Sequence, residues 1–172
     1  LALADWIANR RRRRTADPSR AVSASADSAN EVADGRYPWK PDLFVGLSGP
    51  YDISHHFDYE AGKEVEQISP MKPICGHTRA NFRLANPVNR FLSFLRDDGG
   101  DALTVQRLAP PILLVHGIED STVPFAATAD AGRTLRSCGL TSCDEIYLDG
   151  TGHQDVIMHF MFGGLAKELV LD

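Results

Sequence analysis

A carboxylate and an imidazole lie in two short polar loops in the last third of the chain. Asp120 lies in the segment His116-Gly-Ile-Glu-Asp-Ser-Thr-Val-Pro124, and His153 lies in Asp149-Gly-Thr-Gly-His-Gln154. Each segment directly follows an apolar run. In a Ser-His-Asp triad, a buried acid holds one ring nitrogen of the histidine so that the other nitrogen can take the serine proton. The two loops therefore predict the acid and the base of a nucleophilic acyl transfer.

The elements around these loops predict a parallel sheet that brings the acid and the base together. Residues 112–116 form a continuous apolar run, typical of a strand buried on both faces, and residues 145–148 form a second one. Helices are expected at 125–138 and 154–168. Alternating strands and helices of these lengths indicate an α/β fold with a parallel sheet. Ligands meet such sheets at the carboxyl ends of the strands, so both loops are expected at one edge.

The preceding part of the chain predicts one more strand and a helical cover. Residues 43–48 form a short apolar run that stops at the turn-forming Ser48-Gly-Pro50. Asp52 can cap the following helix, which we expect over residues 55–67. Residues 74–108 mix aromatic and turn-forming residues, which indicates short helices and long loops laid over an opening.

The two loops carry a family resemblance. His-Gly-x-x-Asp-x-x-Val-Pro, followed about thirty residues later by Gly-x-x-His, resembles the acid and base loops of the α/β-hydrolase superfamily. Gly46–Asp52, Ser69–Met71 and Pro110–Gly117 are similar to the esterase branch that contains isoprenylcysteine methylesterases, bacterial esterase/lipase-like proteins and kynurenine formamidase-like hydrolases. The likeness covers residues 41–164. His153-Gln-Asp155 resembles the His-x-Asp of the methylesterases most closely.

The resemblance implies a role for each of these residues. Asp120 is the triad acid and His153 the general base, while Glu119 is the structural alternative to Asp120. Gly46-Leu-Ser48-Gly-Pro50 is similar to a nucleophile elbow, Gly-x-Ser-x-Gly, but its fifth position is proline and no helix follows at once. In the family this stretch is the strand between the elbow and the acid loop. We therefore do not take Ser48 as the nucleophile.

The missing nucleophile suggests that the chain is the C-terminal part of an α/β-hydrolase domain, without the N-terminal strands and the elbow. The chain begins at Leu1, inside an apolar segment, and residues 1–10 resemble the helix that follows the elbow. Residues 11–40 predict a flexible low-complexity insertion. Residues 41–172 then form the hydrolase part, with a lid-like segment at 53–108. The serine is expected several residues before Leu1.

The composition of the chain bears on which kinds of partner it can bind. The formal net charge of −5 gives no general reason to expect a nucleic-acid partner. The exception is Arg10–Arg14, five arginines in a row, which suit either a polyanion-binding patch or a solvated loop after a helix. Cys75, Cys138 and Cys143 lack a disulfide or zinc spacing, so reduced thiols are expected. No apolar run is long enough to span a bilayer.

The remaining histidines and aromatic residues have plainer interpretations. His55 and His56 are adjacent, so they do not share a helix face, and a surface or lid role is favoured over metal ligation. His116 is expected to support its turn. His77 and His159 have no role readable from the sequence. Four aromatic side chains suit either an acyl or prenyl pocket or the hydrophobic core: Phe57, Tyr59, Phe91 and Phe94.

These patterns predict a fragment of a serine carboxylic-ester hydrolase that needs no cofactor and no metal. An amidase or formamidase of the same fold, or a non-catalytic binding fragment, is the alternative. The resemblance implies a small-molecule or prenylated-peptide ester as substrate. The residues themselves leave the location open; the resemblance implies an intracellular, endomembrane-associated protein, with membrane association through the upstream part. Without the serine and the oxyanion hole, the segment is expected to show little or no turnover by itself.

Overall fold

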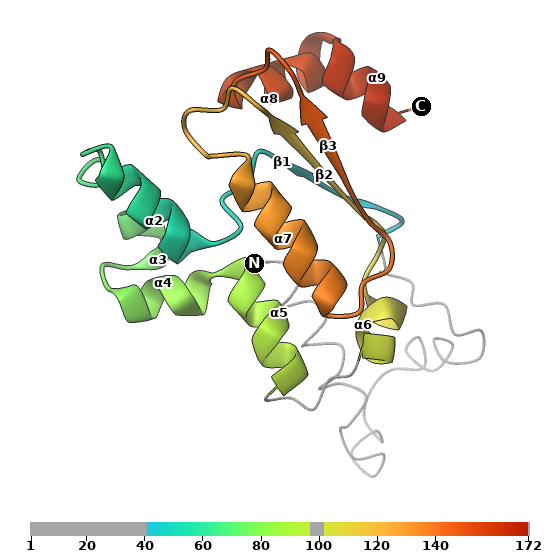
Figure 1. Cartoon of the computed structure of the whole chain (residues 1–172), viewed down its shortest axis with the longest axis horizontal. Coiled ribbons are helices and arrows are strands. Elements are labelled where there is room, and N and C mark those ends of the chain that lie inside the picture. The colour runs from blue at the N-terminus through green and yellow to red at the C-terminus, as the bar shows by residue number, and fades with distance from the viewer. Residues whose placement is uncertain (1–40, 97–101, 172) are drawn as a thin grey trace, which may run out of the picture.

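Three parallel strands in the order β1-β2-β3 form the sheet of this protein (Figure 1). The computed structural model describes residues 41–96 and 102–171. The strands are β1 (Phe44–Leu47), β2 (Ile112–Gly117) and β3 (Cys143–Leu148). β1 pairs with β2 from Phe44↔Ile112 onward, and β2 pairs with β3 from Ile112↔Cys143 to Gly117↔Leu148. The predicted parallel α/β sheet is confirmed, and the carboxyl ends of all three strands lie at one edge.

The side chains of β2 point alternately into two hydrophobic cores, one on each face of the sheet. Ile112 and Leu114 face one core, which is closed by α5 (Pro87–Arg96), α6 (Ala102–Leu108) and α7 (Ala126–Ser137). The two-residue period of a strand places the intervening side chains on the opposite face.

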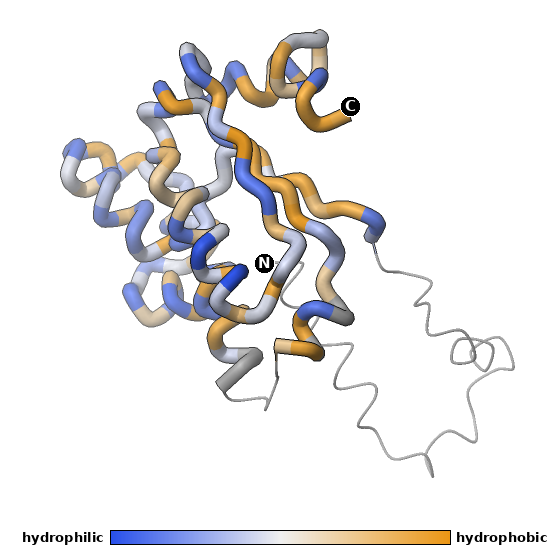
Figure 2. Tube along the Cα trace, turned by 45° about the vertical axis from the view of Figure 1, so that its right-hand side comes forward, coloured by the Kyte–Doolittle hydropathy of each residue, from blue (hydrophilic) through white to orange (hydrophobic). Residues whose placement is uncertain are grey.

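That opposite face is covered by the last two helices, α8 (His153–Phe162) and α9 (Leu165–Leu171). Val115 packs there with Leu148, Val156 and Ala166. Figure 2 shows the hydrophobic residues running along the strands between these layers. Because apolar side chains leave the sheet on both faces, the strands read as continuous apolar runs.

Between β1 and β2 the chain forms short helices, as expected. They are α2 (Ile53–Gly62), α3 (Met71–Cys75), α4 (Arg79–Ala85), α5 and α6. The predicted cap is present, because Asp52 Oδ1 accepts a hydrogen bond from His55 N at 3.0 Å. The helix begins earlier than expected and ends at Gly62 rather than at residue 67. Of the segments expected upstream, residues 1–40 lie outside the described part of the chain.

The predicted helix over residues 154–168 is wrong as a single element, because it is two helices. Gly163 and Gly164 have φ angles of 93° and 151°, a region that L side chains rarely adopt. These glycines end α8 and turn the chain into α9. β3 also begins at Cys143, two residues before the expected start, because Ile112 pairs with Cys143 at the beginning of both strands.

Candidate active site

The loop that follows β2, here called the acid loop (residues 118–125), holds Asp120 in one orientation. Asp120 is buried, with only 5% of its surface exposed. Its Oδ1 accepts hydrogen bonds from the backbone N–H groups of Thr122 at 2.9 Å and Val123 at 2.8 Å. These two bonds are local Asp-to-backbone turns of the kind that favours aspartate in loops. They occupy one carboxylate oxygen and leave Oδ2 pointing out of the loop.

The loop that follows β3, here called the base loop (residues 149–152), brings His153 to the start of α8. Gly150 has a φ of 63°, which lets the chain turn sharply after the strand. Asp155 Oδ2 accepts a hydrogen bond from Gly152 N at 2.8 Å and so caps the helix. His153 is thus the first helical residue, and its position depends on the cap rather than on a flexible loop.

The acid and base loops are joined by two hydrogen bonds and a close backbone contact. Glu119 N donates to Thr151 O at 3.2 Å, and Thr151 N donates to Glu119 Oε2 at 2.8 Å. A Cβ atom at Gly117 would lie 2.1 Å from Thr151 O, so only glycine fits there. Glu119, the alternative acid, therefore ties the two loops together, while Asp120 faces the histidine.

Asp120 and His153 meet at the edge of the sheet. His153 Nδ1 lies 2.7 Å from Asp120 Oδ2, the distance of a charge-assisted hydrogen bond. An ionised carboxylate only accepts, so Nδ1 carries the proton and Nε2 has a free lone pair. The Asp120 side chain has no exposed surface, whereas 32% of the His153 side chain is exposed. Within residues 41–96 and 102–171, Nε2 of His153 forms no hydrogen bond. This geometry suits a general base that faces an open site.

A second histidine contacts the same carboxylate from inside the protein. His116 is completely buried, and its Nε2 lies 2.9 Å from Val123 O and 3.2 Å from Asp120 Oδ2. Its Nδ1 lies 2.6 Å from Thr128 Oγ1 on α7. Burial lowers the pKa of His116, although the nearby Val123 carbonyl and Asp120 oppose this effect. The expected supporting role in the turn thus includes direct contact with the acid.

Helix α2 is fastened to the outer side of the acid loop. Tyr59 Oη donates to Ser121 O at 3.1 Å, and Lys63 Nζ donates to the same carbonyl at 2.6 Å. The ammonium of Lys63 also lies 4.5 Å from the centre of the Tyr59 ring. In Figure 1, α2 accordingly stands beside the connection between β2 and α7. The first helix after β1 therefore supports the loop that carries Asp120.

The surface interpretation of His56 is wrong, because only 5% of this residue is exposed. Its Nε2 lies 3.3 Å from Glu60 Oε1, one helical turn away. Burial lowers the pKa of His56, and Glu60 opposes that effect. Ile53, His56 and Glu60 form the buried side of α2. Their spacing of three and four residues is the signal that could have revealed this inward face from the sequence.

Ser48 lies at the end of β1, and its geometry differs from that of a nucleophile elbow. Its backbone N–H donates to Val115 O at 2.9 Å, so it continues the sheet pairing, and only 2% of the residue is exposed. Helix α2 begins only at Ile53, whereas an elbow turns from strand directly into helix. We therefore assign Ser48 no role as nucleophile.

The other singled-out residues lie apart from the acid and the base. Phe57 packs on Phe82 with ring centres 4.9 Å apart, and Phe91 belongs to the core beside α7. His77 is exposed, and Nδ1 of His159 has no hydrogen-bond partner in the part of the chain that the structure describes. The three cysteines are free. The side chain of Phe94 and the arginine run at 10–14 lie outside the described residues.

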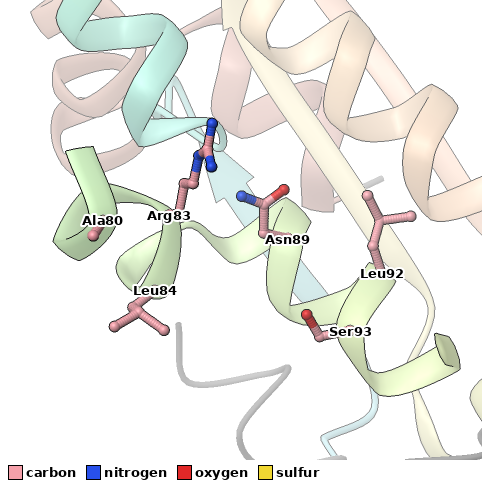
Figure 3. A pocket seen from close by; sticks show the side chains of 6 residues that line it. All are labelled: Ala80, Arg83, Leu84, Asn89, Leu92 and Ser93. Atoms are coloured by element: carbon pink, nitrogen blue, oxygen red, sulfur yellow. The ribbon is translucent and has the colours of Figure 1, made fainter. Parts of the chain in front are cut away.

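A surface pocket is present, but it is not part of this site. It has a volume of about 480 Å³ and is formed by α4 and α5 (Figure 3). Its walls are Ala80, Arg83, Leu84, Asn89, Leu92 and Ser93. Among the described residues, no three His, Cys, Asp or Glu side chains are grouped so that they could hold a metal ion. No helix in the described ranges is long and apolar enough to cross a membrane.

Comparison with known proteins identifies relatives of the fold. No protein-family model matches the chain. The chain is 28% identical over 115 residues to esterase LipC of Mycobacterium tuberculosis (strain ATCC 25618 / H37Rv), a match that covers 65% of this chain and 25% of the esterase. The chain therefore spans about a quarter of the length of this relative.

Two solved structures are similar in fold. One is an acylaminoacyl peptidase in complex with Z-Gly-Gly-Phe-chloromethyl ketone, with a TM-score of 0.50, 14% identity, and 74% of this chain and 18% of the peptidase covered. The other is the uncomplexed Pyrococcus horikoshii acylaminoacyl peptidase, with a TM-score of 0.50, 14% identity, and coverage of 75% and 18%. The parallel sheet with helices on both faces, together with these matches, shows that this chain has part of an α/β-hydrolase fold, and its sequence is similar to part of an esterase.

Proposed function

We propose that this chain carries the acid and the base of a serine carboxylic-ester hydrolase. The observation that carries the proposal is the 2.7 Å hydrogen bond between buried Asp120 and Nδ1 of partly exposed His153. It leaves Nε2 as the free base, which is the arrangement that a serine triad uses. The relationship to an esterase supports hydrolysis of a carboxylic ester.

The proposed mechanism is a two-step acyl transfer. A serine outside the described residues attacks the ester carbonyl while Nε2 of His153 takes its proton, and the histidine then protonates the departing alcohol. Asp120 stabilises the imidazolium that forms in both steps. Water then attacks the acyl-enzyme while His153 takes its proton; the bond to the serine oxygen breaks, His153 returns the proton to that oxygen, and the acid is released. The substrate that we propose is a small-molecule or prenylated-peptide methyl ester, by resemblance to the methylesterases.

The ester-hydrolase proposal is tested with the protein translated from the complete reading frame that encodes this chain. We expect it to hydrolyse 4-nitrophenyl acetate and the methyl ester of a farnesylated cysteine peptide, and to be labelled by a fluorophosphonate on a serine. An N-formyl aromatic amine supplied in parallel separates an esterase from a formamidase. Serine labelling together with a preference for the amide would overturn the ester proposal but keep the triad.

The 172-residue chain provides the complementary assay. It is expected to show little turnover of 4-nitrophenyl acetate, because no serine hydroxyl among the described residues is hydrogen-bonded to Nε2 of His153. Serine-dependent turnover by this chain that His153→Ala abolishes would contradict the proposed division of the site.

A further inference from the structure

We propose that His116 is a positioning residue for the acid: a neutral histidine whose Nε2–H is donated to Val123 O and lies close enough to Asp120 Oδ2 for its positive end to hold the carboxylate toward His153. This inference rests on the proposed function, because it assigns a role relative to the catalytic acid. It is carried by three distances around one fully buried ring: Nε2 to Val123 O at 2.9 Å, Nε2 to Asp120 Oδ2 at 3.2 Å, and Nδ1 to Thr128 Oγ1 at 2.6 Å.

The neighbours of the ring determine where its protons lie. The carbonyl of Val123 can only accept a hydrogen bond, so Nε2 of His116 must carry a proton. A neutral ring then has its lone pair on Nδ1, and the hydroxyl of Thr128 donates to it. The ring has no contact with solvent, and burial lowers its pKa, so both observations favour the neutral form.

This arrangement completes the hydrogen bonding of the acid. Oδ1 of Asp120 accepts from the backbone of Thr122 and Val123, and Oδ2 accepts from His153 and faces the N–H of His116. Rotating the carboxylate about its own axis would break these contacts together. The donor on the inner side of Oδ2 thus helps to keep the outer side directed at His153.

The contact also connects the acid to the rigid part of the fold. Thr128 has no exposed surface and lies on α7, which packs against the core of the sheet. A chain of hydrogen-bonding groups therefore runs from Thr128 through His116 and Asp120 to His153. Partners at both ring nitrogens fix the orientation of the His116 ring, so its Nε2–H stays directed at the loop that carries Asp120.

The first measurement needs no substitution. Two-bond ¹H–¹⁵N spectra of the histidine-labelled 172-residue chain report which nitrogen of each ring carries the proton. We expect His116 to be the Nε2–H tautomer at neutral pH, opposite to His153. A His116 ring with its proton on Nδ1 would overturn the proposal.

The second measurement uses two substitutions that place an amide differently. In His116→Gln the side-chain amide takes the place of Nε2 and can still donate toward Asp120, whereas in His116→Asn it takes the place of Nδ1. We expect the Nδ1 proton of His153 to exchange with water about tenfold faster in His116→Asn than in His116→Gln. Equal exchange rates in the two folded variants would contradict the positioning role.

Thr128 provides an independent variant in case position 116 does not tolerate change. Thr128→Val removes the donor to Nδ1 of His116, and Thr128→Ser keeps it. We expect the ¹⁵N shift of His116 Nδ1 to move in the valine variant and to stay in the serine variant. No movement in either would overturn the proposed proton arrangement. Since all these measurements are spectroscopic, they separate failure of this inference from failure of the esterase proposal, which only the activity assay decides.

Discussion

The site contains two histidines that approach the same oxygen of Asp120 from opposite sides. His153 comes from the start of α8, is 32% exposed in its side chain and engages only Nδ1. His116 comes from β2, is completely buried and engages both nitrogens. The difference teaches that residue type does not decide which histidine can act as a base. A free nitrogen that faces solvent does, and of these two histidines only His153 has one.

The largest expected effect concerns removal of this free nitrogen. In the complete reading-frame product, His153→Ala is expected to lower kcat for an ester by about 10⁴-fold or more, because the serine loses its base. Asp120→Asn is expected to cost up to about 10⁴-fold through the wrong tautomer of the histidine. Steady-state hydrolysis of 4-nitrophenyl acetate measures both. Activity within tenfold of wild type in the folded His153→Ala protein would eliminate His153 as the base.

The second effect tests whether the two loops must touch. Gly117→Ala would place a methyl group 2.1 Å from Thr151 O, where no flexible side chain can yield. We expect this substitution to lower the free energy of unfolding by about 3 kcal/mol, the upper range for overpacking, and to separate Asp120 from His153. Denaturant unfolding measures the loss.

Gly62→Ala is the matched control for this substitution. A Cβ at Gly62 meets nothing within 4 Å, at the end of α2. We expect it to be neutral or to raise the free energy of unfolding by up to about 1 kcal/mol. If the two alanine variants were equally stable, the close packing of the acid and base loops would be refuted.

The third effect is the pH dependence of stability that arises from the two buried histidines, His116 and His56. Burial lowers the pKa values of His116 and His56, whereas an unfolded histidine titrates near its usual value of about 6.5. The unfolded chain therefore binds more protons as the pH falls below about 6.5, and stability is lost in that direction. Each histidine adds a slope of at most about 1.4 kcal/mol per pH step of one.

Unfolding at a series of pH values between about 5 and 7.5 measures this slope. The charged and titratable groups around the two rings are Asp120 and His153 for both, and Glu60 for His56. His116→Gln and His56→Gln should each flatten the curve. A stability that stays constant over this range in the wild-type chain would show that neither ring is held neutral.

The smallest effect concerns the outer support of the acid loop. Tyr59→Phe removes the hydrogen bond to Ser121 O and keeps the ring. We expect a loss of about 0.5–1 kcal/mol in the free energy of unfolding, typical of one partly exposed hydrogen bond. Lys63 also donates to this carbonyl, so the loop should keep its position. A loss as large as that of Gly117→Ala would mean that α2, and not the base loop, holds the acid.

The sequence predicted the sheet and the meeting of the two loops at its edge, because these depend on short-range patterns. The apolar run 112–116 and the motif around Asp120 each carry a local physical signal, and the strands pair as their alternating buried faces require. The contact between Asp120 and His153 followed from the parallel topology, which places consecutive strand ends at one edge.

Long-range partners could not be read in this way. That His116 reaches Thr128, or that Tyr59 reaches Ser121, depends on how α7 and α2 pack, and no spacing in the sequence encodes it. The burial of His56 is encoded in its spacing from Glu60, one helical turn away, and not in its adjacency to His55. The break at Gly163 and Gly164 is not evident from the sequence because the apolar periodicity continues across it.

The most direct test of the central claim is the tautomer of His153 in the wild-type chain and in Asp120→Asn, read from two-bond ¹H–¹⁵N spectra of labelled histidine. Asp120 as the orienting acid predicts a proton on Nδ1 in the wild-type protein. In the asparagine variant, whose amide can donate to Nδ1, the proton should move to Nε2. A proton on Nε2 in the wild type, or a tautomer that Asp120→Asn leaves unchanged, would contradict the assignment of Asp120 and His153 as acid and base.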